Sequence, residues 1–146
     1  MNKYILFKNK KINLNYFIQE SYEAGIELNG SEVKSLVNAN GNIDQAFVIF
    51  KHNEAYIINM YIAPYKHTNT IEENDGYRNR KLLLHKKEII KIQYLMKKNR
   101  WALIPNMVYL LKNKIKIELS LTKSKRKSDK REDIKKRDAD REIRQY

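Results

Sequence analysis

The chain has 146 residues, 42% of them hydrophobic, which is enough for one domain with a buried core. It carries 30 Lys and Arg against 17 Asp and Glu, a formal net charge of +13, which favours a polyanionic partner such as nucleic acid or an acidic membrane surface. The absence of cysteine excludes disulfide scaffolds and thiolate zinc sites, and no apolar run approaches the ~20 residues of a membrane span, so we expect a soluble, cytoplasmic protein.

The first predicted elements are a long strand and a short helix. Residues 16–18 and 24–28 are the two apolar ends of one strand, and Gly25 marks an expected β-bulge. A helix is predicted over residues 32–37, because Asn and Ser residues that can cap a helix precede it and a glycine follows it.

A hairpin and a second helix follow along the chain. Residues 47–50 and 54–62 are rich in β-branched and aromatic side chains and flank a short polar turn, which predicts a β-hairpin. Residues 64–80 form a long polar stretch without periodicity, and a loop of this length is usually functional or disordered. A helix is predicted from about His85 to Asn99, since apolar residues recur on one face among solvated lysines.

The last predicted elements form a second strand pair. Residues 114–122 alternate apolar and polar side chains, as in a half-buried strand, and residues 107–111 supply its partner. Pro105 cannot lie in a central strand, so we expect this partner to begin at an edge or after a loop. The pattern predicts a mainly β fold with helices: an OB-like closed antiparallel β-barrel of about six strands, with two or three flanking helices. An open sheet packed on a helix is the alternative.

The composition changes near Thr122. Residues 123–146 hold 11 basic and 6 acidic side chains and few apolar ones, so this segment cannot bury enough surface to offset its ordering entropy. We therefore divide the chain into an RNA-binding barrel, 1–122, and a basic C-terminal tail, 123–146. The tail is predicted to be disordered when free and helical on a polyanionic surface; a merely solubilising tail is the alternative.

No catalytic centre is predicted, and the protein is not expected to be an enzyme or to need a cofactor. The four clustered acidic residues Glu20, Glu23, Glu27 and Glu32 are interpreted as polar strand positions rather than as an acid–base pair. The three histidines lack metal-ligand spacing, so no metal site is expected. An RNA hydrolase that uses Glu23 is the rival enzyme hypothesis.

Basic residues interleaved with tyrosine favour an RNA-binding surface instead. Arg78, Arg80 and Lys81 end the long polar loop and lead into Leu83, and arginine binds phosphate oxygens bidentately. Lys10 and Lys11 precede the first predicted strand. A solvated surface is the alternative interpretation of each single cluster.

Seven collinear motifs resemble those of the SsrA-binding protein (small protein B) family. They span about Asn9 to Ile143 and comprise residues 9–11, 16–18, 22–26, 32–36, 64–69, 80–85 and 129–133. Leu14 and Ser124 depart from the family's usual His and Gly, and the chain ends several residues earlier than most relatives.

The resemblance implies an OB-like barrel and a non-catalytic task in trans-translation, the rescue of stalled bacterial ribosomes. It implies binding to the tRNA-like domain of transfer-messenger RNA (tmRNA) and its delivery to the A site. The tail is expected to enter the small subunit's decoding centre and empty mRNA channel. Alanyl-tRNA synthetase and elongation factor Tu are expected as indirect partners, with no membrane partner and a monomeric state. A general OB-fold single-stranded RNA-binding or ribosome-associated protein is the alternative.

The resemblance ties Asn9, Glu23 and Leu83 to tmRNA binding and the tail motif to action on the ribosome. The predicted RNA-binding residues are Asn9, Lys10, Lys11, Tyr16, Glu23, Tyr65, His67, Arg78, Arg80, Lys81 and Leu83. The predicted ribosome and decoding-centre residues of the tail are Lys123, Lys125, Arg126, Asp129, Lys130 and Arg131.

Overall fold

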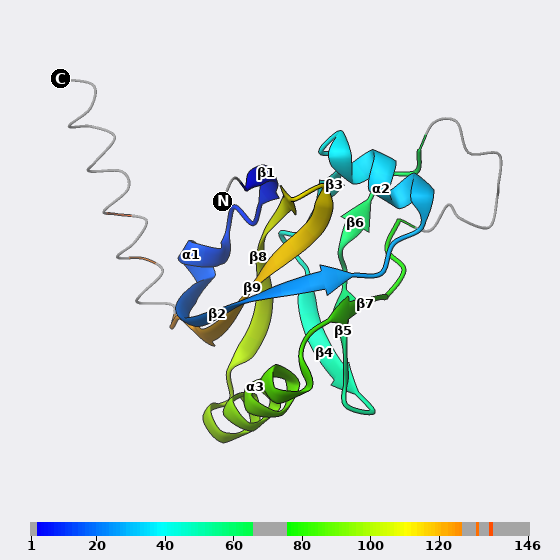
Figure 1. The fold of residues 1–146 in the computed structure, drawn as a ribbon. Helices are drawn as coiled ribbons and strands as arrows, with labels where there is room; N and C mark the ends of the chain where they lie inside the picture. The colour runs from blue at the N-terminus through cyan, green and yellow to red at the C-terminus, as the bar shows by residue number, and fades with distance from the viewer. Residues whose placement is uncertain (1–2, 66–75, 127–130, 132–134, 136–146) are drawn as a thin grey trace.

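The structure is a computed structural model that describes residues 3–65, 76–126, 131 and 135. Figure 1 shows a curled antiparallel sheet with helices packed around it. The elements in this part of the chain are, in order, β1 (Tyr4–Lys8), α1 (Ile12–Asn15), β2 (Tyr16–Ile26), α2 (Gly30–Val37), β3 (Gly41–Asn42), β4 (Phe47–Lys51), β5 (Glu54–Ile58), β6 (Tyr61–Ile62), β7 (Arg80–Leu83), α3 (Lys86–Asn99), β8 (Ala102–Leu111) and β9 (Lys114–Ser124).

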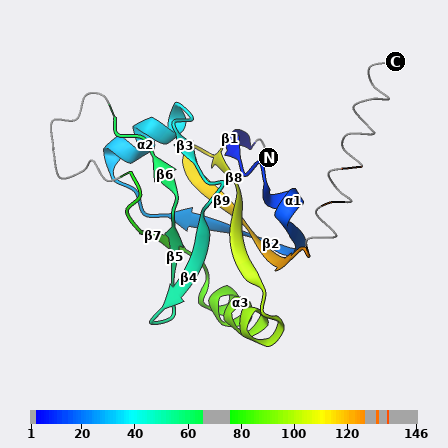
Figure 2. The ribbon, with the colours of Figure 1, turned by 180° about the vertical axis from the view of Figure 1, so that it is seen from behind.

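Seven of the strands form one sheet in the order β1-β8-β9-β2-β7-β5-β4, and every ladder in it is antiparallel. β3 and β6 pair separately. The prediction of a mainly β fold with helices is confirmed. The closed barrel is not: among the described residues no ladder joins the two outer strands, although β4 also contacts β8, and the view from behind shows the curl of the sheet (Figure 2).

The two predicted strand pairs are hairpins with two-residue turns. His52 and Asn53 join β4 to β5, and Lys112 and Asn113 join β8 to β9; all four residues have positive φ, between 51° and 65°. Two successive left-handed residues match the right-handed twist of the flanking strands. The alternation predicted for the last strand is confirmed on its core side, where three side chains are fully buried: Ile117, Leu119 and Leu121.

The structure differs from the prediction at three places in the sheet. The strand expected over residues 54–62 ends at Ile58, because Asn59 has φ 61° and turns the chain into β6. The irregularity in β2 lies between Ile18 and Glu20 and not at Gly25. Pro105 lies inside β8, which begins before it.

Pro105 is tolerated within β8 because of where the neighbouring strand stops. β1 pairs with β8 only from Leu110 to Met107, so β8 has no partner on that side at Pro105. The ladder with β9 shifts register between Pro105 and Met107, which is the bulge that a proline favours.

The two predicted helices are confirmed with nearby boundaries, and α1 was not predicted. Asn29 caps α2: its side chain accepts from the Glu32 backbone N–H at 2.9 Å, and its own N–H donates to the Glu32 carboxylate at 3.0 Å. On α3, Ile92 is fully buried against the sheet. Among the described residues, no helix has the length and apolar character required to span a membrane.

Candidate nucleic-acid interface

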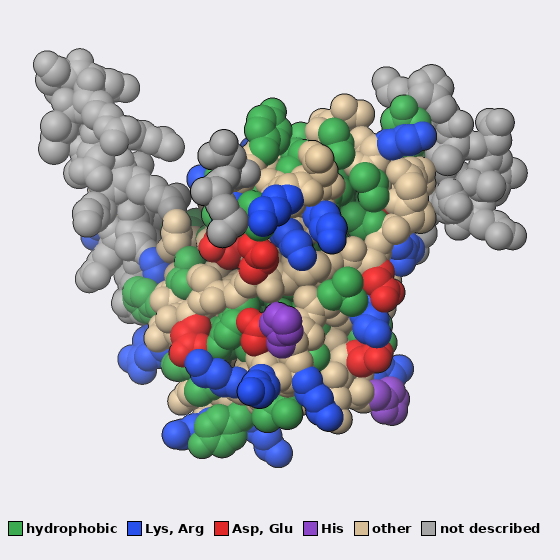
Figure 3. Space-filling view, viewed as in Figure 1, with side chains coloured by type: hydrophobic (Ala, Val, Ile, Leu, Met, Phe, Trp, Pro, Cys, Tyr) green, Lys and Arg blue, Asp and Glu red, His purple; other side chains and the backbone are tan. Residues whose placement is uncertain are grey.

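Three of the predicted residues, Glu23, Lys81 and Leu83, line one groove of about 650 Å³. The groove lies on the outer face of the sheet, where β2 and β7 meet the beginning of α3. Gly25 and Lys116 also line it. Figure 3 shows basic, acidic and apolar side chains gathered on this face of the molecule. The groove therefore offers cations, carboxylates and apolar side chains within one concavity.

Leu83 is the apolar part of the groove, and Gly25 makes room for it. The two residues are partners in the β2–β7 ladder. A Cβ atom added to Gly25 would lie 3.2 Å from the Leu83 Cβ, which is tighter than most real contacts. Leu83 is nevertheless 50% exposed. A leucine held at the surface in this way can contact a sugar or a base.

Glu23 is held in place by a buried tyrosine. The Tyr109 hydroxyl donates to the Glu23 carboxylate, and Tyr109 is fully buried. Burial, followed by the hydrogen bond to Glu23, raises the pKa of Tyr109, so the phenol stays protonated as a donor. Glu118 lies opposite Glu23 in the ladder, and its carboxylate accepts from the Asn106 side chain at 3.1 Å. Each of these neighbouring carboxylates thus has its own donor.

Lys81 forms a partly exposed ion pair at the groove. Its Nζ atom lies 3.1 Å from the Glu54 carboxylate, whose other oxygen accepts from the Tyr56 hydroxyl at 2.8 Å. The hydrogen bond from Tyr56, and then that from Lys81, lower the pKa of Glu54, and the Glu54 carboxylate raises the pKa of Lys81. An exposed pair of this kind is easily exchanged for a phosphate.

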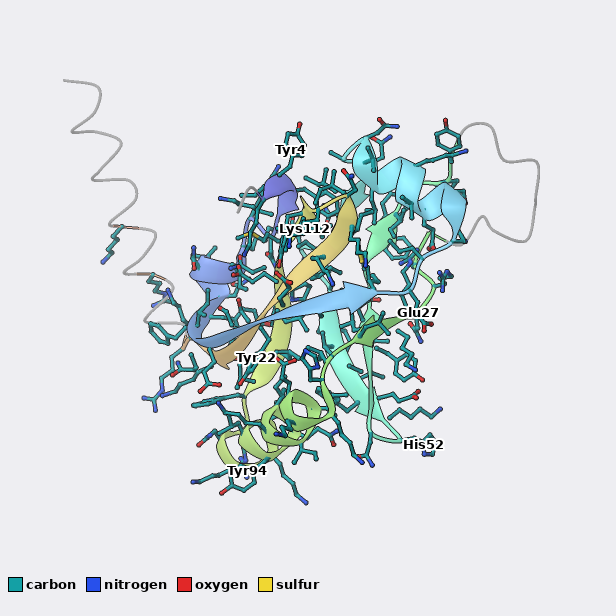
Figure 4. The ribbon with its side chains drawn as sticks, viewed as in Figure 1. Tyr4, Tyr22, Glu27, His52, Tyr94 and Lys112 are labelled. Carbon is teal, nitrogen blue, oxygen red and sulfur yellow. The ribbon has the colours of Figure 1, made fainter. Side chains whose placement is uncertain are left out.

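Sequence reasoning missed the lysines of β9 that adjoin the groove. Lys116 lines both this groove and a second hollow of about 390 Å³, to which Lys114 and the α2 residues Val33 and Val37 contribute. Lys112 lies at the turn before them (Figure 4). The alternation of residues 114–122 indicated that these lysines lie on the polar side of the strand. It could not indicate that this side borders a groove, because the groove is formed by the neighbouring strands.

The prediction that Arg80 contacts RNA needs a correction. Arg80 is 1% exposed, and its Nε atom lies 2.5 Å from the Glu32 carboxylate. Its other guanidinium nitrogens donate to backbone carbonyls, including that of Met60 at 2.9 Å. Arg78 also pairs with Glu32 but remains 42% exposed. A buried charge must be paired to be stable, so Arg80 has a structural role that joins β7 to α2.

Asn9 is buried as well. Its side-chain amide donates to the Pro105 carbonyl at 3.1 Å and to the Ile43 carbonyl at 3.4 Å, and its side-chain oxygen accepts from the Lys11 backbone N–H. These bonds fix the chain between β1 and α1 against the β8 bulge. The neighbouring side chains of Lys10 and Lys11 are exposed. Asn9 is therefore placed to position this segment rather than to touch a ligand.

The remaining predicted residues are spread over the surface. Tyr16 and Tyr65 are half-buried, and the Lys34 Nζ atom lies 5.3 Å from the Tyr65 ring centroid. His67 lies outside the described residues. Neither Tyr16 nor Tyr65 lines the groove of Glu23 and Leu83.

The beginning of the predicted tail is attached to the body. The Lys125 backbone N–H donates to the Asn15 carbonyl at 2.9 Å, and its Nζ atom donates to the Asn13 carbonyl and lies 4.8 Å from the Phe17 ring centroid. Of the other tail residues predicted to act on the ribosome, Lys123, Arg126 and Arg131 are exposed, while Asp129 and Lys130 lie outside the described residues.

No metal centre was found in the described part of the chain, where no three His, Cys, Asp or Glu residues cluster to hold an ion. The lysines, the exposed leucine and the carboxylate fixed by Tyr109 form a surface that can bind a ligand.

A curled antiparallel sheet whose outer groove combines lysines, carboxylates and apolar side chains can bind RNA, which is gripped through its phosphates and its bases. Residues 6–146 match the family model of the SmpB protein. The chain belongs to this family, whose members are the SsrA-binding proteins.

Curated relatives and a solved structure agree with this assignment. The chain is 54% identical over 142 residues to the SsrA-binding protein of Malacoplasma penetrans (strain HF-2), covering 97% of each chain. It is 48% identical over 139 residues to that of Persephonella marina (strain DSM 14350 / EX-H1), covering 95% of this chain and 91% of the relative. A similar solved structure, described as "tmRNA-SmpB: a journey to the center of the bacterial ribosome", has a TM-score of 0.69 and 35% identity, over 88% of this chain and 93% of the other.

Proposed function

We propose that this chain binds the tRNA-like domain of tmRNA and delivers it to the A site of stalled ribosomes during trans-translation. The observation that carries the proposal is the groove that brings Glu23, Lys81 and Leu83 together in a member of the SmpB family. The protein itself needs no catalytic group for this task. It acts in the cytoplasm as a monomer, and alanyl-tRNA synthetase and elongation factor Tu act on the RNA that it holds.

The groove supplies three kinds of contact that suit a folded RNA. Lys81 and Lys116 can bind phosphate oxygens, and Leu83 can pack against a ribose or an unstacked base. The Glu23 carboxylate can accept a hydrogen bond from a base amino group or a 2′-hydroxyl. A carboxylate repels phosphates, so its place among lysines favours recognition of a specific nucleotide over general attraction to RNA.

We further propose that the tail, 123–146, senses the empty mRNA channel and the decoding centre. Lys123 and Arg126 place exposed positive charge at the beginning of the tail, and Lys125 attaches this beginning to α1. A vacant mRNA channel is lined with phosphates and would order a basic segment. A channel filled with mRNA would exclude it by steric overlap and competition for the same sites.

The binding proposal is tested by anisotropy titration of a labelled transcript of the tRNA-like domain. The chain should bind this RNA more tightly than an unrelated hairpin of equal length. Leu83→Ala and Glu23→Ala should weaken binding to the tRNA-like domain only. Equal affinity for both RNAs, unchanged in the two variants, would instead favour the general RNA-binding alternative.

The tail proposal separates binding from action on the ribosome. Asp129→Ala/Arg131→Ala should retain the affinity for the tRNA-like domain and abolish peptide tagging of stalled ribosomes in a reconstituted translation system. A loss of RNA affinity in this variant would contradict the proposed division between body and tail.

A further inference from the structure

Helix α3 carries two different faces along its length. Toward the sheet, Ile92 is fully buried, and Leu95 and Met96 pack partly buried against the core. Five exposed residues lie on the solvent side. Along the sequence they are three, one, three and four positions apart, a spacing that places them on one side of the helix. These residues, here named the α3 strip, are Lys87, Ile90, Lys91, Tyr94 and Lys98.

The apolar members of the α3 strip are unusually exposed. Ile90 and Tyr94 are each 61% exposed, and among the large hydrophobic residues described only Tyr4 is more exposed. Figure 4 shows Tyr94 on the side of α3 turned away from the sheet. Single exposed apolar residues are normal, but two of them one helical turn apart and flanked by lysines form a contact patch.

The charge of α3 is not explained by the helix alone. Lysine in the last turn, such as Lys98, is favoured by the negative end of the helix dipole. Lys87 lies in the first turn, where the same dipole disfavours a cation. The nearby Glu88 carboxylate accepts from the His85 backbone N–H at 3.2 Å. Lys91 forms an exposed pair with Glu20 at 3.5 Å, and such a pair contributes little to stability. A polyanionic partner would offset this cost.

The α3 strip continues directly from the groove. Ile90 lines the groove together with Glu23 and Leu83, and it also belongs to the strip. From Ile90 to Lys98 the helix extends about 12 Å at its usual rise of about 1.5 Å per residue. A strand of RNA that leaves the groove at Ile90 can therefore follow α3 for about two nucleotides.

We propose that the α3 strip is a second RNA contact, which extends the groove along the helix to the backbone of the same bound RNA. Lys87, Lys91 and Lys98 bind phosphates, while Tyr94 stacks on a base or ribose. This inference rests on the proposed function, because it assigns the strip to the RNA that occupies the groove.

The test measures anisotropy titrations of the tRNA-like-domain transcript at several salt concentrations. Tyr94→Ser should weaken binding about tenfold. Lys91→Gln/Lys98→Gln should reduce the slope of log affinity against log salt by about 2, one for each lost phosphate contact. The matched control is Lys8→Gln/Lys51→Gln, which removes the same charge from β1 and β4, two strands that line neither hollow.

The outcomes distinguish this inference from the proposed function. If Leu83→Ala weakens binding while both α3-strip variants bind like the unmodified chain, the α3 contact is overturned and the groove stands. An equal change of slope in the Lys8→Gln/Lys51→Gln control also overturns it, since the effect would then be general electrostatics. If the unmodified chain does not prefer the tRNA-like domain at all, the proposed function fails. Thermal unfolding of each variant verifies that its fold is unchanged.

Discussion

The buried hydroxyl of Tyr109 on β8 donates to the carboxylate of Glu23 on β2, reaching across the intervening strand β9. The two residues are 86 positions apart in the chain. Tyr109 has no exposed surface of its own, so its contribution to any ligand is to fix the direction of Glu23. It is a positioning residue for the proposed interface.

Tyr109→Phe should therefore weaken binding of the tRNA-like domain several-fold, because Glu23 loses the donor that orients it. The free energy of unfolding should fall by only about 1 kcal/mol, the usual net value of one hydrogen bond. The matched control is Tyr22→Phe, which deletes the equivalent bond to Glu20, a residue that lies outside the groove but pairs with Lys91 of the α3 strip. Anisotropy titration and urea unfolding measure the two effects. An RNA affinity of Tyr109→Phe equal to that of the unmodified chain would remove Tyr109 from the interface.

Gly25→Ala should reduce RNA affinity through Leu83. The added methyl would lie 3.2 Å from the Leu83 Cβ, so the leucine must shift from its place in the groove. The control is Gly30→Ala at the beginning of α2, where an added Cβ meets nothing within 4 Å. We expect several-fold weaker RNA binding for Gly25→Ala and unchanged binding for Gly30→Ala. Binding by Gly25→Ala that matched the control would show that the position of Leu83 is unimportant.

Glu32→Gln should destabilise the fold strongly, because it leaves the buried guanidinium of Arg80 without its counter-charge. Breaking a buried pair costs about 3–5 kcal/mol in the free energy of unfolding. The control is Glu54→Gln, which removes an exposed pair with Lys81 and should leave the free energy of unfolding almost unchanged. Urea unfolding at neutral pH measures both. A loss below about 1 kcal/mol in Glu32→Gln would contradict the structural role of the pair.

Glu32 should also make stability depend on pH. Burial alone would raise the pKa of Glu32, but hydrogen bonds from Arg78, the Asn29 backbone and Arg80 outweigh it and lower that pKa below the usual 4.5. Because the pKa is lower in the folded state, this stabilisation is present above pH 4.5 and is lost as the pH falls through the folded-state value. Urea unfolding between neutral and acidic pH should show a smaller acid loss in Glu32→Gln than in the unmodified chain.

Asn9→Ala should lower the free energy of unfolding more than it lowers RNA affinity. The buried amide satisfies two backbone carbonyls, so its removal leaves them unpaired and should cost about 1–3 kcal/mol in the free energy of unfolding. RNA affinity at a temperature where the variant stays folded should change less than in Leu83→Ala. The control is Asn13→Ala, whose side chain is exposed in α1. A large loss of affinity with unchanged stability would make Asn9 a direct contact.

The regular elements were predictable where one face of the element meets the core and the other meets solvent. The helical period in residues 85–99 was confirmed, since apolar side chains repeat with the geometry of the backbone. The alternation in residues 114–122 was confirmed on its core side, while Ser120 and Thr122 on the predicted polar side are buried as well. The short strands β1, β3 and β7 were not predicted, and β6 was included in the strand expected over residues 54–62, because a few residues carry too little periodicity. The helix α1, with four residues, is equally short.

The roles of charged and polar side chains were less predictable. Arg78 and Arg80 belong to the same basic cluster in the sequence, yet one is half exposed and the other is buried. Both pair with Glu32 of α2, but Arg80 also donates to the backbone carbonyls of Met60 and Gly76, which enclose it. The likeness of the seven motifs identified the family correctly, but it could not distinguish a residue that touches RNA from one that holds the surface in shape.

The sequence by itself determined the secondary structure of the long elements, the excess of positive charge and the family, because these depend on local spacing and composition. The tertiary structure alone decided that Glu23, Leu83 and Lys116, from three separate strands, line one groove. It also decided that Arg80 and Asn9 lie inside the molecule. The physical reason is that burial and proximity depend on which strands pair and on which face they are covered, and pairing partners in an antiparallel sheet can lie anywhere along the chain.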